Sequence, residues 1–390
     1  MNEYKKVLWS INKHKSDYYD LSLSKKDVNH TRRIYKSKKI APESVESVTA
    51  AYILDRNSLI RFIIKELDIL LQPSGNFKII FTSMKNQRHA LGIRSVMQIM
   101  YEFSVSTNGR YILKSKEEGK NFTILNYIKK SSTLKENDSI ENWSFGIITN
   151  GQNNDSVKSL VESIIDQNIP NFEVNICGPS PYDSQLPNNV YISKDVKISP
   201  DIRGPISRKK NTLIKISKIE NLCLLHDRYL LPKNWYSNMK EYGNYFDFLE
   251  IPNVDISKLR APYHQVYNNN IADIYMRSYP FLRLKQSSPN QFLQGGSITG
   301  KKSIMCKNLF LDHLHWGEFE DVHFSKKNYL DGSLIYLDKN NYFITNSNRF
   351  KDLVIRESYL YNLYFTIKNF YLLIYILLVH KYNSYKKSIH

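Results

Sequence analysis

The sequence predicts an α/β protein of two domains. A chain of 390 residues is longer than most single domains, and 42% hydrophobic residues are enough for two buried cores. From residue 143 onward, strand-like and helix-like segments alternate, which is typical of a sheet with parallel strands. A shorter set of such segments lies between residues 45 and 129. The predicted limits are 1–132 and 140–355 for the two domains and 356–390 for a C-terminal helix.

The smaller set of segments begins with a helix. Apolar residues recur at helical spacing from Leu59 to Leu71, after a typical helix start at 55–58. The elements predicted next are a turn at 72–75, a strand at 77–81, a helix at 92–104 and two paired strands at 111–114 and 122–128.

The larger set follows a polar linker over 129–142. The predicted elements are a strand at 143–149, a helix at 157–168, a strand at 172–178, a helix at 207–219 and a strand at 222–225. Strand, helix and strand in succession imply a parallel pair with a right-handed crossover. The last strand runs directly into His226-Asp227-Arg228, at the sheet edge where such folds hold a nucleotide.

Charge and cysteine content narrow the choice of partners. The formal charge of +18 favours anionic partners, but the basic residues are scattered and match no nucleic-acid recognition pattern, so no nucleic-acid partner is expected. The cysteines Cys177, Cys223 and Cys306 match no metal or redox spacing, which predicts reduced core thiols in a cytoplasmic protein. The chain opens on polar residues and shows no signal-peptide pattern.

The C-terminal segment is apolar and aromatic, and basic residues follow it. Its uninterrupted apolar core, 370–379, is about half of the ~20 residues that span a bilayer. Two interpretations stay open for it. An interfacial helix would hold the protein peripherally on an anionic membrane surface, at the inner face of the membrane. Alternatively, the helix packs on the preceding domain.

Six short segments from residue 149 onward occur in an order that matches a known family. They are Thr149–Gly151, Gln167–Val174, Gly204–Asn211, His226–Arg228, Gln294–Lys301 and Trp316–Asp321. In this order, residues 143–335 resemble a GT-A fold glycosyltransferase of the family 2 type. His226 stands where that family has the first acid of its Asp-x-Asp motif.

The resemblance implies a function and a cofactor. It implies an inverting, metal-dependent transfer of a sugar from a nucleotide-diphosphate donor to a saccharide or lipid-linked acceptor. The product would be a bacterial surface polysaccharide such as capsule or lipopolysaccharide. The cofactor would be Mn²⁺ or Mg²⁺, which neutralises the leaving diphosphate.

The resemblance also implies roles for individual residues. Asp321 is the expected general base, and Glu320 would hold Asp321 or bind acceptor hydroxyls. The expected metal ligands are Asp227 and His323. The expected donor-binding residues are Thr149, Asn150, Gly151, Arg208, Lys209 and His226, and the expected acceptor-binding residues are Gly295, Gly296 and Trp316.

Some of these roles have a simpler structural alternative. Asp227 can be a strand-end cap, because Asp is common in turns. Arg208 and Lys209 can form a solvated helix start, Trp316 can be a core residue, and His323 can be structural.

Residues 45–129 carry a second likeness, in the helix, the Leu71–Gly75 turn and the closing antiparallel strands. They resemble the late part of a class I S-adenosylmethionine-dependent methyltransferase. The first glycine of the chain is Gly75, so the glycine-rich turn that such an enzyme needs after its first strand is missing. The implied domain is truncated and non-catalytic. Two rival functions remain: a non-catalytic scaffold of a glycan assembly complex and a saccharide methyltransferase, against which the missing turn argues.

Overall fold

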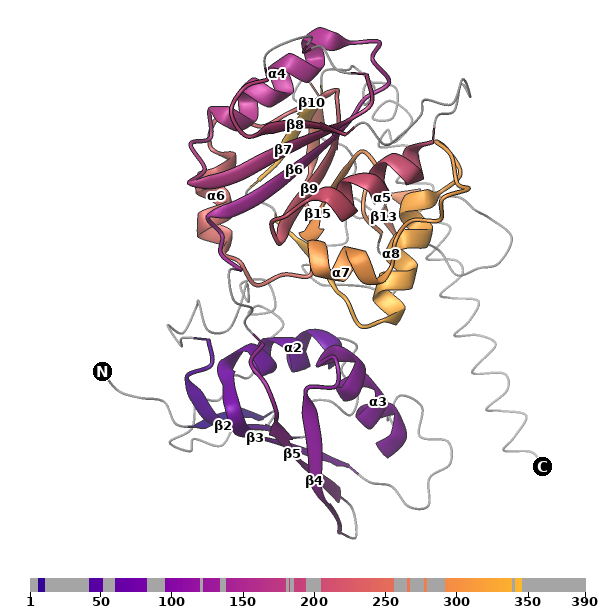
Figure 1. Cartoon of the computed structure of the whole chain (residues 1–390). Helices are drawn as coiled ribbons and strands as arrows, with labels where there is room; N and C mark the ends of the chain where they lie inside the picture. Colours follow the sequence, from indigo (N-terminus) through magenta and orange to yellow (C-terminus); the bar gives the residue numbers. More distant parts are fainter. Residues whose placement is uncertain are drawn as a thin grey trace, which may run out of the picture.

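The computed structural model contains two α/β domains, each built around its own sheet (Figure 1). It describes residues 6–10, 42–51, 60–82, 95–119, 122–133, 138–179, 182, 186–193, 205–255, 265–266, 277–278, 292–338 and 341–345. The predicted class, a smaller α/β domain ahead of a larger one, is confirmed. The domain limits drawn from the sequence stay predictions, and the C-terminal segment 356–390 lies outside the described residues.

The smaller domain has a five-stranded sheet in the order β1-β2-β3-β5-β4. Its strands are β1 (Lys6–Ser10), β2 (Val45–Ala51), β3 (Leu71–Thr82), β4 (Tyr111–Glu118) and β5 (Phe122–Lys129). Its helices are α2 (Ile60–Leu70) and α3 (Val96–Ser106). The first three strands are parallel, and β5 is antiparallel to both β3 and β4, so the predicted hairpin is confirmed.

The predicted turn at 72–75 lies inside β3 and not between elements. Leu71 pairs with Val45, and Asn76 pairs with Ser47, so the segment between the two pairs bulges out of the ladder. The proline in this segment cannot donate a ladder hydrogen bond, which favours an irregularity at this point. The turn signal therefore marks a bulge, and the chain continues in the same strand.

The larger domain has a seven-stranded sheet in the order β16-β11-β15-β9-β6-β7-β8. Its strands are β6 (Asn142–Ile148), β7 (Asn171–Cys177), β8 (Val190–Ser193), β9 (Asn221–His226), β11 (Phe248–Glu250), β15 (Ser297–Lys301) and β16 (Ile335–Leu337). Neighbours are parallel except at β15, which runs antiparallel to β9 and β11. The strands β8, β7, β6 and β9 follow the order third, second, first, fourth, which is the Rossmann-like arrangement.

Helices cover both faces of this sheet (Figure 1). They are α4 (Asn154–Ile165), α5 (Ile206–Ile216), α6 (Trp235–Tyr242), α7 (Lys302–Lys307) and α8 (Glu320–Leu330). A small second sheet joins β10 (Tyr229–Leu230), β17 (Phe343–Thr345) and β12 (Asn253–Asp255), and β13 (Gln265–Val266) pairs with β14 (Arg277–Ser278).

Side chains of β6 show how the sheet separates two cores. Trp143, Phe145 and Ile147 point to the core that α4 covers, whereas Ile148 belongs to the core under α5. At Gly146, an added Cβ would lie 3.2 Å from the Leu213 side chain of α5. The missing side chain thus lets α5 lie close to the strand that leads into the candidate site.

One face of α2 contacts the larger domain. Arg61 donates a hydrogen bond to the Tyr329 carbonyl oxygen, and its guanidinium lies 4.5 Å from the centroid of that tyrosine ring. Lys65 forms an ion pair of 2.8 Å with Asp247 of the larger domain. Tyr245 packs against the core of the smaller domain.

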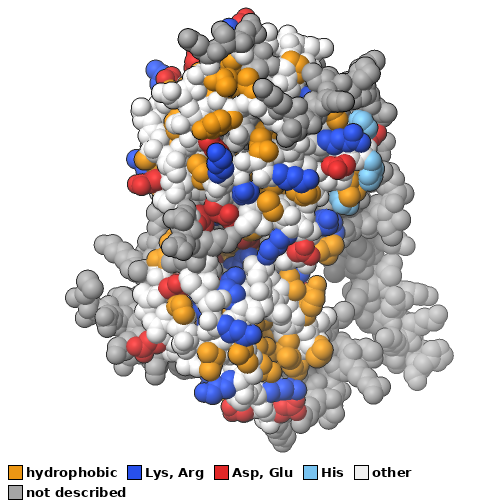
Figure 2. Space-filling model, viewed as in Figure 1, with side chains coloured by type: hydrophobic (Ala, Val, Ile, Leu, Met, Phe, Trp, Pro, Cys, Tyr) orange, Lys and Arg blue, Asp and Glu red, His pale blue; other side chains and the backbone are white. Residues whose placement is uncertain are grey.

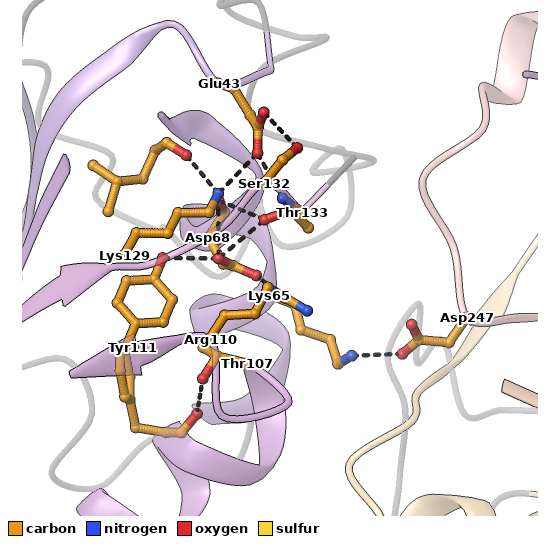
Figure 3. A network of polar contacts seen from close by, with 12 residues as sticks. Glu43, Lys65, Asp68, Thr107, Arg110, Tyr111, Lys129, Ser132, Thr133 and Asp247 are labelled. Atoms are coloured by element: carbon orange, nitrogen blue, oxygen red, sulfur yellow. Dashed lines mark hydrogen bonds and ion pairs between the residues drawn. The ribbon is translucent and has the colours of Figure 1, made fainter. Parts of the chain in front are cut away.

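A buried network of polar contacts connects elements of the smaller domain (Figure 3). Lys129, predicted as the first linker residue, is instead the last residue of β5 and is fully buried. Its Nζ donates to Glu43 Oε1 (3.1 Å), the Asp68 carbonyl (2.8 Å) and the Leu71 carbonyl (2.5 Å). The prediction of Lys129 as a linker residue is therefore wrong. It failed because the partners of Lys129 lie far away in the sequence.

Asp68 is the second centre of this network. Its carboxylate accepts a hydrogen bond of 2.7 Å from the Tyr111 hydroxyl and another from Arg110. Burial and the neighbouring Asp68 carboxylate raise the pKa of Tyr111 well above its usual value. The tyrosine therefore stays a hydrogen-bond donor at every physiological pH.

The exposure of the cysteines tests one further expectation. Cys177 and Cys223 are buried as predicted, but Cys306 is exposed on α7 and is not a core thiol. Among the residues that the structure describes, no helix has both the length and the apolar content to cross a membrane.

Candidate active site

Strands β6 and β9 end side by side and bring predicted donor-site segments together. Ile148 and His226, the last residues of these strands, are paired. The backbone N–H of Asp227 donates to the Ile148 carbonyl at 3.1 Å. Thr149 follows Ile148 directly and is almost fully buried. Thr149, His226 and Asp227 therefore share the carboxyl edge of the sheet.

Lysine 209 reaches the same edge from the first turn of α5. Its Nζ donates to the Thr149 carbonyl oxygen at 2.6 Å, and the lysine is 5% exposed. Burial lowers the pKa of Lys209, while the nearby Cys177 and Asp227 act in the opposite direction. The neighbouring Arg208 is exposed, so the helix phase turns only one of these two predicted residues inward.

Asp227 sits in a half-buried position with mixed electrostatics. Burial raises the pKa of Asp227 above its usual value. A hydrogen bond from the Thr149 side chain and the charges of Arg228 and Lys209 act against this rise. A cation at this edge would favour the ionised carboxylate further.

The loop after β6 is shaped by its own side chains. The Gly151 N–H donates to Thr149 Oγ1, and the Gln152 N–H donates to Asn150 Oδ1, both at 3.0 Å. Gly151 has φ +79°, and a Cβ there would lie 2.6 Å from Pro179. Asn150 is exposed at the tip. The predicted donor-binding loop is therefore compact and open on its outer side.

The acidic pair Glu320 and Asp321 opens helix α8. Lys210 on α5 forms a buried ion pair with Glu320, with 2.9 Å between Nζ and Oε1. Asp321 Oδ2 accepts a hydrogen bond of 2.8 Å from the Gly295 N–H. A Cβ at Gly295 would lie 2.7 Å from Asp321 Oδ2 and 2.9 Å from Glu320 Oε1. Only glycine at this position lets both carboxylates approach the backbone so closely.

The Gly295–Gly296 turn connects the two acidic regions. The His226 N–H donates to the Gly296 carbonyl oxygen at 3.0 Å. A Cβ at Gly296 would lie 2.6 Å from the Tyr229 hydroxyl oxygen and 3.0 Å from an Arg228 guanidinium nitrogen. The turn therefore has the His226–Arg228 segment on one side and the acidic pair of α8 on the other. The structure brings together residues that lie far apart in the sequence.

Asp321 has the protonation behaviour of a useful base. Burial raises the pKa of Asp321 to about 6, and the Glu320 charge acts in the same direction. Lys210 and hydrogen bonds from the Val322 and Gly295 N–H groups act against this rise. A carboxylate with this pKa is ionised at neutral pH and more basic than an ordinary aspartate.

Glu250, at the end of β11, is a site residue that sequence reasoning missed. It is 3% exposed, and within the described residues its Oε2 has no hydrogen-bond partner. Burial raises the pKa of Glu250 to about 8, and the Asp321 charge raises it too, against a backbone hydrogen bond from Gln294. The signal that could have found it is the one used for Asp227, a carboxylate at the end of a buried strand.

The stability of the protein should reflect this glutamate. Because the pKa of Glu250 is raised from 4.5 to about 8 on folding, the folded state holds a proton that the unfolded state has lost between these pH values. Its contribution to the unfolding free energy therefore falls as pH rises, by up to about 1.4 kcal/mol per pH unit. Glu250→Gln removes this decline, so urea titrations at pH 5, 6.5 and 8 should show a growing advantage of the variant. Parallel pH dependences would contradict the assignment.

The remaining predicted residues lie on or before α8. Trp316 is 52% exposed, so it is not the core residue of the simpler alternative. His323 is largely exposed on α8, and its pKa is lowered by partial desolvation and by the charges of Lys327 and His313. The electrostatic partners of His323 are thus basic residues and not Asp227.

The side chains that could act as metal ligands determine how a metal ion could be held. In the part of the chain that the structure describes, no three His, Cys, Asp or Glu side chains gather closely enough to hold a metal ion. Asp227 can supply one carboxylate oxygen at the sheet edge, and Mg²⁺ or Mn²⁺ commonly takes its other ligands from phosphates and water. The residues therefore fit a cation that arrives with a diphosphate and do not form a closed protein cage.

Comparisons with known proteins give limited likenesses. No family model and no curated protein matches the chain. Among solved structures, S. aureus TarS 1–349 is similar at TM-score 0.39 and 15% identity, over 53% of this chain and 60% of that one. GalNAc-T7 with UDP, GalNAc and Mn²⁺ is similar at TM-score 0.41 and 13% identity, over 55% of this chain and 45% of that one.

A third similar structure concerns a different class of protein. A protein described as a type 11 methyltransferase from Sulfolobus solfataricus gives TM-score 0.25 and 16% identity, over 34% of this chain and 88% of that one. The chain spans less than two thirds of the TarS and GalNAc-T7 structures. At these low scores the likenesses assign no activity, so the function is argued from the residues of this chain.

Proposed function

We propose that the larger domain transfers a glycosyl group from a nucleotide-diphosphate donor to an acceptor hydroxyl. The observation that carries the proposal is the Gly295–Gly296 turn, which has Asp227 and Asp321 in the segments on its two sides. One carboxylate can serve the leaving diphosphate, and the other can serve the attacking hydroxyl. The carboxyl edge of a Rossmann-like sheet is also where such folds bind nucleotides.

The donor side uses the residues around β6, β9 and α5. The loop Thr149–Gly151 would contact the nucleotide, and Lys209 and Arg208 would offer positive charge to the phosphates. Asp227 would hold Mn²⁺ or Mg²⁺, which supplies charge neutralisation for the leaving diphosphate. His226 would face the donor from the end of β9. A second metal role for His323 rests on the sequence resemblance alone.

The acceptor side uses α8 and the turn before β15. Asp321 would take the proton from the acceptor hydroxyl as its oxygen attacks the anomeric carbon. The bond between that carbon and the diphosphate oxygen breaks on the opposite face, so the configuration inverts. The Gly295 N–H holds Asp321 in place, and the Lys210 pair holds Glu320 beside it. The exposed Trp316 ring would stack on an acceptor sugar.

The wider role follows from the sequence resemblance. It supports a saccharide or lipid-linked saccharide acceptor in bacterial surface polysaccharide synthesis, at the inner face of a membrane. The rival interpretation is a non-catalytic scaffold, which stays open because His226 stands where the family has its first metal-binding acid. Binding of the donor separates the two interpretations.

The donor test compares Asp227→Asn with a matched control. Glu241→Gln removes a carboxylate that is exposed on α6, outside the candidate site. Calorimetric titration with UDP, GDP and CDP, with and without Mn²⁺, should show metal-dependent binding of one nucleotide to the intact protein. We expect Asp227→Asn to weaken it about tenfold or more and Glu241→Gln to leave it unchanged. Equal binding by both variants would exclude Asp227 as the metal ligand, and absence of binding would favour the scaffold.

A further inference from the structure

A cavity of about 370 Å³ lies between the two domains. Its lining includes Glu220 and Asp247, which directly precede β9 and β11, and Lys301, which ends the antiparallel β15. Asp227 follows β9 at its other end. At roughly 3.3 Å per residue, a strand of this length separates the two edges by about 20 Å. The cavity is therefore distinct from the candidate active site and lies at the opposite edge of the sheet.

Charges along this cavity are balanced in number, and within the described part of the chain all of them except Lys307 already have a partner. Four basic and four acidic side chains line it. Lys65 pairs with Asp247 at 2.8 Å and Lys301 with Asp138 at 2.7 Å. Arg110 pairs with Asp68, and Glu220 accepts hydrogen bonds from the Ser303 hydroxyl and N–H. Figure 2 shows basic and acidic side chains close together at the boundary between the domains.

This pairing decides the charge of the ligand. Lys307 is exposed and, among the described residues, is the lining cation without an ion pair. An anionic or cationic ligand that used the other charges would have to displace an existing partner and leave a charge without compensation. A neutral ligand with hydroxyl groups can use the remaining lone pairs and N–H groups without breaking any pair.

Aromatic rings give the cavity its apolar part. Tyr245, Phe246 and Tyr336 line it, together with the amide side chains of Asn108 and Asn244. On the Phe246 ring, Lys301 Nζ lies 4.5 Å from the centroid, so a flat base could not cover the whole of that face. The C–H face of a sugar needs only a partial ring surface, and its hydroxyls suit carboxylate and amide partners.

We propose that this cavity binds a neutral saccharide of one or two sugar units. Its volume is near the lower end of small-molecule sites, which span about 300–1,000 Å³. The saccharide would contact both domains, so its binding would favour the docked arrangement of the small domain. The proposal gives the smaller domain a binding role that needs no methyltransferase activity. It does not depend on the proposed transfer reaction.

The test uses the full chain and two substitutions of Lys307. Saturation-transfer NMR with maltose, cellobiose and N,N′-diacetylchitobiose, at up to about 20 mM each, measures weak saccharide binding. Lys307→Trp places a large ring in the cavity, whereas Lys307→Ala leaves the cavity open. We expect at least one disaccharide to bind the intact protein, with affinity within about twofold for the alanine variant and at least about tenfold weaker for the tryptophan variant.

Each other outcome overturns the proposal. Absence of binding by all three disaccharides contradicts a saccharide site. Binding that Lys307→Trp leaves unchanged places the sugar elsewhere, for example at the acceptor side of the candidate active site. Inorganic phosphate that binds the intact protein but not Lys307→Ala would make the cavity an anion site. Uridine that competes with the disaccharides would make it a nucleoside site.

Unchanged melting temperatures of both variants show that the fold is intact.

Discussion

Replacement of Asp321 by Asn should reduce donor turnover by about a thousandfold while leaving nucleotide binding intact. The amide keeps the size of the side chain but cannot accept the proton of the attacking hydroxyl. Because burial raises the pKa of Asp321 to about 6, turnover of the intact protein should rise with pH up to about 6 and then level off. The measurement is nucleoside-diphosphate release as a function of pH, beside calorimetric donor binding.

A matched control separates the chemistry from an effect on the helix. Asp155 lies in the first turn of α4, as Asp321 lies in the first turn of α8, but Asp155 is exposed. Asp155→Asn removes the same favourable interaction with a helix N-terminus, worth about 0.3–1 kcal/mol, and should leave turnover unchanged. An Asp321→Asn variant that retains near-normal turnover would exclude this residue as the base. A variant that loses nucleotide binding would indicate a structural role.

Replacement of Lys129 by Met should destabilise the smaller domain by about 3–5 kcal/mol. The methionine has a side chain of similar length but no ammonium group. The Asp68 and Leu71 carbonyls and the Glu43 carboxylate therefore lose the donor that they share. The Asp68 carboxylate would also lose a cation 3.5 Å away. Buried acceptors without donors are costly, because water cannot reach them.

The neighbouring lysine provides the control. Lys130 is exposed, and Lys130→Met should change the unfolding free energy by no more than about 0.5 kcal/mol. Scanning calorimetry of both variants measures the difference directly. If the two variants have the same melting temperature, the network seen in Figure 3 contributes little to stability.

Periodicity made most of the fold predictable. The helix predicted at 157–168 is α4 at Asn154–Ile165, and the strand predicted at 222–225 is β9 at Asn221–His226. The helix is long enough for its apolar periodicity to be clear, whereas the strand is recognised as a short apolar run bounded by polar residues. The parallel pairing of β6 and β7 also follows from the order strand, helix, strand.

The candidate site could be predicted only in part. Asp227 and Asp321 are recognisable because each is an acid next to a strong local signal, a buried strand or a Trp-Gly turn. Lys209 points inward and Arg208 outward because consecutive residues of a helix face different directions. The sequence shows only a run of basic residues and does not indicate which of them is buried. Glu250 ends a strand of three residues, which is too short to show any periodicity.

The burial of Lys129 could not be predicted for a different reason. A lysine is rarely fully buried, and its acceptors Glu43 and Leu71 lie 86 and 58 residues earlier in the chain. Only the folded sheet brings them together. The paired charges of the cavity between the domains depend in the same way on contacts between distant segments, such as Lys65 and Asp247.

The most direct test of the proposed transferase is release of nucleoside diphosphate from a panel of nucleotide sugars, with and without Mn²⁺. The panel pairs UDP, GDP and CDP with common hexoses and their N-acetylated forms. We predict that the full chain releases nucleoside diphosphate from one donor class only when Mn²⁺ or Mg²⁺ is present, and that the release disappears in Asp227→Asn. Failure of every donor to bind or react, with or without metal, would contradict the transferase and leave the scaffold as the function of this chain.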